Sequence, residues 1–171
     1  MRDGDLAFRC GYGVCSRAVT LAEDEGVYSH VGVLLWKDGG WRVIHAVPRE
    51  LEGKDDFARV KEERVEVFYG PDRAFRGCLV HTGLTDSLKI RQMCASAMKQ
   101  ARDSVRFDGD YDLEDSTKVY CTEFVWRLYR QAGIDLSEGR RRRVNALHVQ
   151  GDCLLPEHLL KYGNNDIYYK F

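Results

Sequence analysis

Two strand-like segments joined by a tight turn constrain the fold of this chain more than any other feature. The segments His30–Trp36 and Trp41–Val47 are rich in β-branched and aromatic residues, and the four residues between them, Lys-Asp-Gly-Gly, are typical of a β-hairpin. We therefore predict an antiparallel pair of strands closed symmetrically over Lys37–Gly40, in which Trp36 faces Trp41.

The register of this hairpin places two histidines side by side. Symmetric closure sets Gly32 opposite His45, and His30 opposite Val47. His30 and His45 then lie on one face as diagonal neighbours, with Cβ atoms about 7 Å apart. A shift of two residues would keep them on the same face. A catalytic base is held in its working tautomer by such a second polar group, although two histidines in a sheet can also be ordinary hydrogen-bonded residues.

A cysteine begins the segment whose periodicity is among the clearest in the chain. Apolar residues recur at helical spacing over Cys121–Ala132, and Gly133 follows as a stop signal. In the first turn of a helix, free N–H groups and the helix dipole favour a thiolate and lower the thiol pKa. The same N–H groups could hold the oxyanion of a tetrahedral intermediate. The alternative is that Cys121 is simply the first core residue of the helix.

The remaining pattern predicts a mixed domain. Further strands are expected at Asp5–Cys10, Arg64–Tyr69 and Asp166–Phe171, and further helices at Val14–Ala22 and Ser87–Asp103 with Ser87 as the cap. Strands dominate the first part of the chain and helices the middle, which favours an α+β fold with helices packed on an antiparallel sheet. A length of 171 residues suits one domain, so we expect residues 1–171 to form a single domain.

Composition and charge exclude several classes of partner. The formal net charge is −1, which predicts neither nucleic-acid nor acidic-membrane binding. The longest apolar run, Val31–Trp36, is too short for a membrane span. Because Met1–Asp5 lacks an apolar signal core, we expect a cytoplasmic protein or the processed form of an envelope protein. The oligomeric state does not follow from the sequence.

The spacing of the cysteines and of the charged clusters bears on which metals and ligands the chain could hold. Six cysteines, at positions 10, 15, 78, 94, 121 and 153, include no Cys-x-x-Cys pair, which favours reduced thiols. Acidic residues over Asp108–Asp115 lack the glycine and closing glutamate of a calcium loop. Arg140–Arg143 is more typical of a solvated loop or the rim of an acidic-substrate site than of an RNA-binding surface, because no aromatic residues interleave it. Two imidazoles and a thiolate suit Zn²⁺, which leaves a zinc site as an alternative use of His30, His45 and Cys121.

Four motifs in a fixed order carry a resemblance to a known family. They are Gly4–Leu6, Tyr28–Val33, Val43–Pro48 and Tyr120–Val125. Together they resemble the circularly permuted branch of the NlpC/P60 cysteine hydrolases, the YiiX/YebB-like group. In ordinary members the cysteine helix precedes the histidine strands, whereas here the histidines come first, which is the permuted order.

The resemblance implies a papain-like core and a set of site residues. Cys121 would be the nucleophile, His30 the base and His45 the third, orienting residue. The permuted group often has a carboxylate at the third position, so His45 departs from a common pattern. Family members also place a tyrosine near the nucleophile to support the oxyanion; Tyr111 is our candidate, with Tyr28 and Tyr120 as competitors.

The function implied is that of a cysteine hydrolase, either a thiol peptidase or an amidase. A Cys121 thiolate would attack the carbonyl of a peptide or amide substrate, for example a cell-wall-type peptide, and His30 would protonate the leaving group. We expect no cofactor and no metal. The alternatives are a lipid or ester acyl hydrolase or acyltransferase of the same superfamily, and a non-catalytic binding module that retains the fold.

Overall fold

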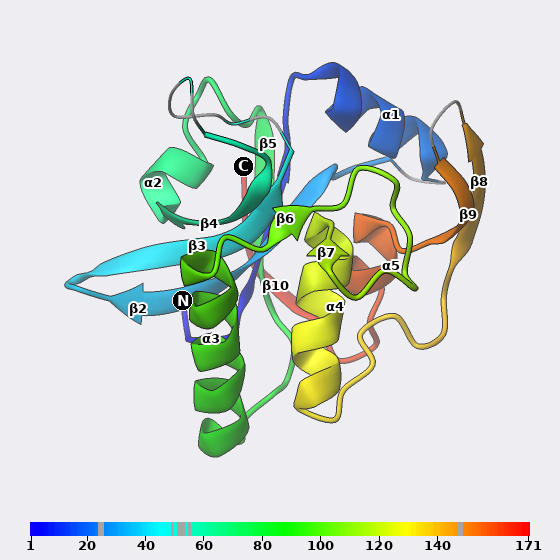
Figure 1. Cartoon of the computed structure of the whole chain (residues 1–171). Coiled ribbons are helices and arrows are strands. Elements are labelled where there is room, and N and C mark those ends of the chain that lie inside the picture. Colours follow the sequence, from blue (N-terminus) through cyan, green and yellow to red (C-terminus); the bar gives the residue numbers. More distant parts are fainter. Residues whose placement is uncertain (24–25, 49, 51–53, 55, 147–148) are drawn as a thin grey trace.

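The computed structural model describes residues 1–23, 26–48, 50, 54, 56–146 and 149–171. Its main sheet has eight strands in the order β10-β5-β1-β2-β3-β4-β6-β7, and β8 and β9 form a separate pair (Figure 1). The strands are β1 Leu6–Cys10, β2 His30–Lys37, β3 Gly40–Val47, β4 Arg59–Arg64, β5 Arg76–His81, β6 Arg106–Phe107, β7 Lys118–Val119, β8 Arg142–Ala146, β9 Val149–Cys153 and β10 Asp166–Lys170. The helices are α1 Val14–Ala22, α2 Val65–Phe68, α3 Ser87–Arg102, α4 Cys121–Gln131 and α5 Pro156–Leu160.

Two cores, one on each face of the sheet, hold these elements together. Helices α3 and α4 lie side by side and pack on the face formed by residues such as Val31, Val33 and Ile44 (Figure 1). The smaller core on the other face contains Leu34 and, from α2, Phe68. Side chains of successive strand residues point to opposite faces, so His30 and His45 share the face of the smaller core.

The predicted hairpin is confirmed with its register. Trp36 pairs with Trp41 and Leu34 with Val43. The turn residues Asp38 and Gly39 both have positive φ, 51° and 75°, as a type I′ turn requires. Strands and helices were also predicted correctly, within one or two residues at their ends, at β1, α1, α3, α4 and β10.

The strand predicted over Arg64–Tyr69 is wrong. Strand β4 occupies Arg59–Arg64, and the chain then turns into the short helix α2. This turn buries Phe68 completely, whereas Val67 remains 43% exposed. The alternation of Val65 and Val67 indicated a strand, but burial of Phe68 on the sheet decides the local conformation.

The cap predicted for α3 is also wrong by one residue. Asp86, not Ser87, is the N-cap, because its carboxylate accepts hydrogen bonds from the N–H groups of Leu88 and Lys89. Within the described residues, no helix is long and apolar enough to cross a membrane. The cysteines whose side chains are described, Cys10, Cys78, Cys94, Cys121 and Cys153, are buried and form no disulfide with one another.

Candidate active site

A cavity of about 340 Å³ opens at one end of the central strands. Its lining includes Arg9 and Gly11 at the end of β1, His30 at the start of β2 and Val47 at the end of β3. Cys121 reaches the same cavity from the N-terminus of α4. Although α4 packs on the other face of the sheet, its first residue lines the same cavity as His30.

Cys121 is held by the backbone of β2 as well as by its own helix. It is 7% exposed, and the N–H of Val31, the residue after His30, hydrogen-bonds its sulfur. The Thr122 hydroxyl lies 3.7 Å from the same sulfur. The thiol therefore lies beside the histidine strand with its position fixed by two elements far apart in the sequence.

The two histidines contact each other as the hairpin predicted. Nε2 of His30 lies 2.7 Å from Nδ1 of His45, a hydrogen-bonding distance, and both rings are buried. With Nε2 of His30 engaged by His45, Nδ1 is the ring nitrogen left for the reacting groups. This is the arrangement in which a second polar group fixes the orientation of a base.

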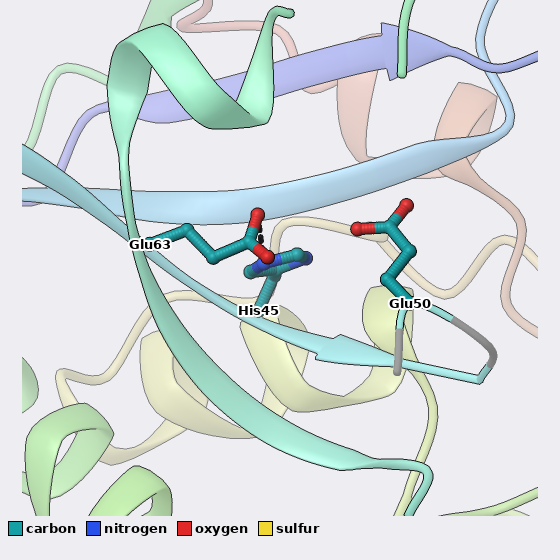
Figure 2. Close-up of side chains that lie close together, drawn as sticks. All are labelled: His45, Glu50 and Glu63. Atoms are coloured by element: carbon teal, nitrogen blue, oxygen red, sulfur yellow. Dashed lines mark ion pairs between the residues drawn. The ribbon is translucent and has the colours of Figure 1, made fainter. Parts of the chain in front are cut away.

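A carboxylate that sequence reasoning missed lies behind the histidine pair. Oε2 of Glu63 on β4 is 3.2 Å from Nε2 of His45, and Glu63 is 5% exposed (Figure 2). Val43 pairs with Glu63, and His45 with Lys61, so Glu63 is the diagonal neighbour of His45 on one face. Five of the six residues of Arg59–Arg64 are charged, which concealed a buried strand.

The protonation states differ from the expectation of a lowered thiol pKa. Burial raises the pKa of the Cys121 thiol, and the hydrogen bonds from Thr122 and the backbone N–H groups do not reverse this. Burial, followed by the positive charge of Arg9 and the neighbouring His45, holds the pKa of His30 well below its usual value. The resting pair is therefore a neutral thiol and a neutral imidazole, because desolvation outweighs the helix N-terminus.

Aromatic and cationic groups hold the histidine pair in place. The Phe68 ring lies 5.8 Å from the ring of His30 and 5.2 Å from that of His45, measured between centroids. The guanidinium of Arg9 lies over the Phe68 ring, with its central carbon 4.4 Å from the ring centroid, and donates a hydrogen bond of 2.8 Å to the Phe68 carbonyl. Packing by Phe68 restricts both imidazoles to the orientation in which they meet.

Of the three candidate tyrosines, only Tyr111 lines the cavity. Its φ is 58°, a conformation that is uncommon outside glycine and often found at functional sites. Asp108 holds this loop by accepting the N–H groups of Asp110 and Asp112. These hydrogen bonds give Asp108 a structural role, which is to hold the turn that carries Tyr111.

The competing tyrosines are structural. Tyr28 is 4% exposed, packs on Phe8 and directs its hydroxyl to Cys78. The Tyr120 hydroxyl accepts a hydrogen bond from the N–H of Leu154 at 2.8 Å, which ties α4 to the C-terminal segment. Neither belongs to the residues that line the cavity.

The arginines of the run Arg140–Arg143 make intramolecular contacts. Arg140 donates to the carbonyls of Ser137 and His158, and Arg141 lies over the Trp126 ring at 4.8 Å. Arg140 and Arg141 lie in the loop before β8, whereas Arg142 and Arg143 belong to β8 itself, so the loop predicted for the whole run holds only for its first two residues.

One group of potential metal ligands includes the inner histidine. Ligand atoms of His45, Glu50 and Glu63 lie within 4.8 Å of one another (Figure 2). Both carboxylates already face cations, since Glu50 forms ion pairs with Arg9 and Arg73, and Arg73 is 3.7 Å from Glu63. Two positive charges balance two negative ones, and Arg9 is buried. A divalent cation would have to displace the arginines, so this donor set does not fit a metal ion.

Comparison with known proteins places this geometry in a known architecture. The chain is similar to the crystal structure of the metalloprotein YiiX from Escherichia coli O157:H7, with a TM-score of 0.79 over 99% of this chain and 97% of that chain. The chain has the YiiX fold. The α+β architecture predicted from the sequence is thereby confirmed, and at 17% identity the likeness to YiiX concerns the fold alone. No protein-family model and no curated protein matches the sequence.

Proposed function

We propose that the chain is a cysteine hydrolase that cleaves a peptide or other amide bond through Cys121. The observation that carries the proposal is the meeting of Cys121 and His30 in one cavity, with the second nitrogen of His30 already bonded to His45. The order of the histidine and cysteine motifs supports it, as does the YiiX fold. Thiol, base and orienting group are the parts that nucleophilic acyl transfer needs.

The reaction follows from the neutral resting state of the pair. As the sulfur of Cys121 bonds to the substrate carbonyl carbon, its proton passes to Nδ1 of His30. The tetrahedral intermediate collapses when the C–N bond breaks and His30 gives that proton to the leaving amine. Water then attacks the thioester with His30 as base, the C–S bond breaks, and the proton returns to the thiol.

Stabilisation of the oxyanion is assigned to α4 and Tyr111. The first turn of α4 begins at Cys121, where backbone N–H groups have no partner within the helix. Donors of this kind stabilise the negative oxygen that develops on the attacked carbonyl. Tyr111 lines the cavity and can supply a hydroxyl donor to the same oxygen.

The cavity walls favour an amide or peptide over a lipid chain. Charged and hydroxyl side chains are among the lining residues, namely Arg9, Ser16, Ser29, Glu50, Asp72 and Arg73, so the cavity surface is not continuously apolar. A long acyl chain needs a continuous apolar channel, whereas a peptide can hydrogen-bond to such walls. Lipid or ester acyl transfer is the alternative function, because it would use the same Cys121 and His30.

The test is capture of the acyl-enzyme. With p-nitrophenyl acetate as the probe, we expect a burst of nitrophenol and an acetyl group on Cys121, located by peptide mass spectrometry. Cys121→Ser and His30→Ala should each abolish the burst. Cys94→Ala is the control, because Cys94 lies on the buried face of α3 outside the cavity lining, and this variant should retain the burst. Acetylation spread evenly over the cysteines, or absent, would contradict a catalytic thiol and favour the binding module.

A second measurement separates the substrate classes. Release of nitroaniline from acyl-dipeptide nitroanilides is compared with release of fatty acid from phosphatidylcholine vesicles. Faster turnover of the peptides supports the amidase proposal. Turnover of the vesicles alone would assign the site to lipid acyl transfer.

A further inference from the structure

A continuous chain of polar contacts runs from the cavity into the sheet. It begins at His30, whose Nε2 lies 2.7 Å from Nδ1 of His45. It continues from Nε2 of His45 to Glu63 at 3.2 Å, a contact that Figure 2 shows. His45 is fully buried and Glu63 nearly so. Among the residues that the structure describes, Nε2 of His45 and both Glu63 oxygens form no hydrogen bond of good geometry, so the 3.2 Å ion-pair contact joins two buried groups that have no hydrogen bond elsewhere. Glu63 and His45 therefore depend on each other.

The ionised carboxylate of Glu63 determines which ring nitrogen of His45 and of His30 carries a proton. An ionised carboxylate only accepts, so Glu63 requires a proton on Nε2 of His45. Neutral His45 then has an unprotonated Nδ1, which can only accept a hydrogen bond. His30 must donate to it from Nε2, and its own Nδ1 is left unprotonated. That is the tautomer a base needs when its Nδ1 takes the thiol proton.

We propose that Glu63 is a positioning residue that sets the tautomer of His30 through His45. The inference deepens the proposed function and rests on it. It assigns a role to a side chain on β4, outside the four motifs that carry the family resemblance. Glu63 touches neither the cavity nor a reacting atom and acts only through His45.

Charges on the neighbouring elements keep Glu63 ionised. Burial acts to raise its pKa, but the contact and charge interaction with His45, followed by the positive charges of Arg73 and Arg9, outweigh burial and lower the pKa. Burial and the charge of Arg9 lower the pKa of His45, against the opposing effects of Glu63 and Glu50. A neutral His45 beside an ionised Glu63 is the combination that the tautomer argument requires.

The test uses the whole chain and two adjacent glutamates. Glu63→Gln removes the buried charge, and Glu62→Gln is the matched control because Glu62 is partly exposed and pairs with Lys37 and Arg42. We expect Glu63→Gln to lower kcat by about 10²-fold with little change in KM, since an amide can also donate to His45 and reverse the tautomers. Loss of the Glu63 carboxylate should also lower the pKa of His30, because an imidazolium on His30 loses a stabilising negative charge. The acid limb of the plot of kcat against pH should therefore move to lower pH. Glu63→Asp should recover part of the rate.

A spectroscopic readout separates this inference from the proposed function. Nitrogen-15 shifts of the histidine rings in the unmodified protein should show protonated Nε2 and unprotonated Nδ1 on both His30 and His45. A proton on Nδ1 of His45, or a Glu63→Gln variant that matches Glu62→Gln in rate and pH profile, would overturn the role of Glu63. Equimolar Zn²⁺ that displaces the proton from Nε2 of His45 would overturn it as well. Full activity of Cys121→Ser would instead overturn the hydrolase proposal and leave the tautomer result intact.

Discussion

His45 lies directly across the hairpin from Gly32, and this pairing explains how the two imidazoles reach each other. The paired residues around it, Val33 with Ile44 and Leu34 with Val43, continue the register to this position. A Cβ atom on Gly32 would lie 3.0 Å from Cβ of His45 and 2.5 Å from Cγ1 of Val43. The absence of a side chain at residue 32 thus leaves the space in which His45 meets His30.

Gly32→Ala should destabilise the protein and impair the site together. We expect the free energy of unfolding to fall by about 1–3 kcal/mol, the usual cost of overpacking, and the acylation rate to fall as His45 is displaced. Thermal unfolding and the p-nitrophenyl acetate burst measure the two effects. Gly109→Ala is the control, since a Cβ there meets nothing within 4 Å. An active, stable Gly32→Ala variant would show that the close contact relaxes without cost.

Alkylation of Cys121 should depend on pH as a buried neutral thiol does. Because burial raises the pKa of the thiol and lowers that of His30, little thiolate is present at neutral pH. The rate of reaction with iodoacetamide should keep rising above the pKa of a free thiol, about 8.5. Glutathione measured under the same conditions is the reference. A rate plateau that begins below pH 6 would instead reveal a preformed thiolate–imidazolium pair.

Tyr111→Phe should reduce turnover without loss of stability. Removal of one oxyanion donor costs about 10²-fold in kcat, and the Phe ring retains the contact with Tyr120, whose centroid lies 4.9 Å away. Tyr28→Phe is the matched control, because Tyr28 lies in the core away from the cavity lining. Equal kcat values for the two variants would remove Tyr111 from the oxyanion site.

Glu123→Gln should stabilise the protein above neutral pH. Burial raises the pKa of Glu123 to about 7 from 4.5, despite the ion pair with Arg127. The folded state therefore retains a proton that the unfolded state releases, and stability is lost as the pH rises from about 4.5 towards 7. The glutamine removes this loss and can still accept the N–H of Tyr120.

The measurement for this variant is a pair of unfolding curves at pH 5 and pH 8. The gain in unfolding free energy over the unmodified protein should be larger at pH 8, by about 1–3 kcal/mol. Glu114→Gln, a change at an exposed position, should show no such difference. A gain that is equal at both pH values would mean that Glu123 does not titrate in this range.

Local signals predicted the parts of the site that are close in sequence. Alternation on both sides of the Asp38–Gly39 turn determines the hairpin register, and the register determines that His30 and His45 are neighbours. The apolar periodicity of α4 likewise determines that Cys121 begins a helix. Both results need only backbone geometry within one element or one hairpin.

The sequence by itself determined the hairpin, the helix that begins at Cys121 and the order of the histidine and cysteine motifs. Only the tertiary structure decided that Glu63 contacts the histidine pair, that Tyr111 rather than Tyr28 lines the cavity, and that burial raises the pKa of the Cys121 thiol. These outcomes depend on burial and on contacts between distant strands. Desolvation and long-range charge have no signature in local spacing, because the same residue can be exposed or buried under one periodic pattern.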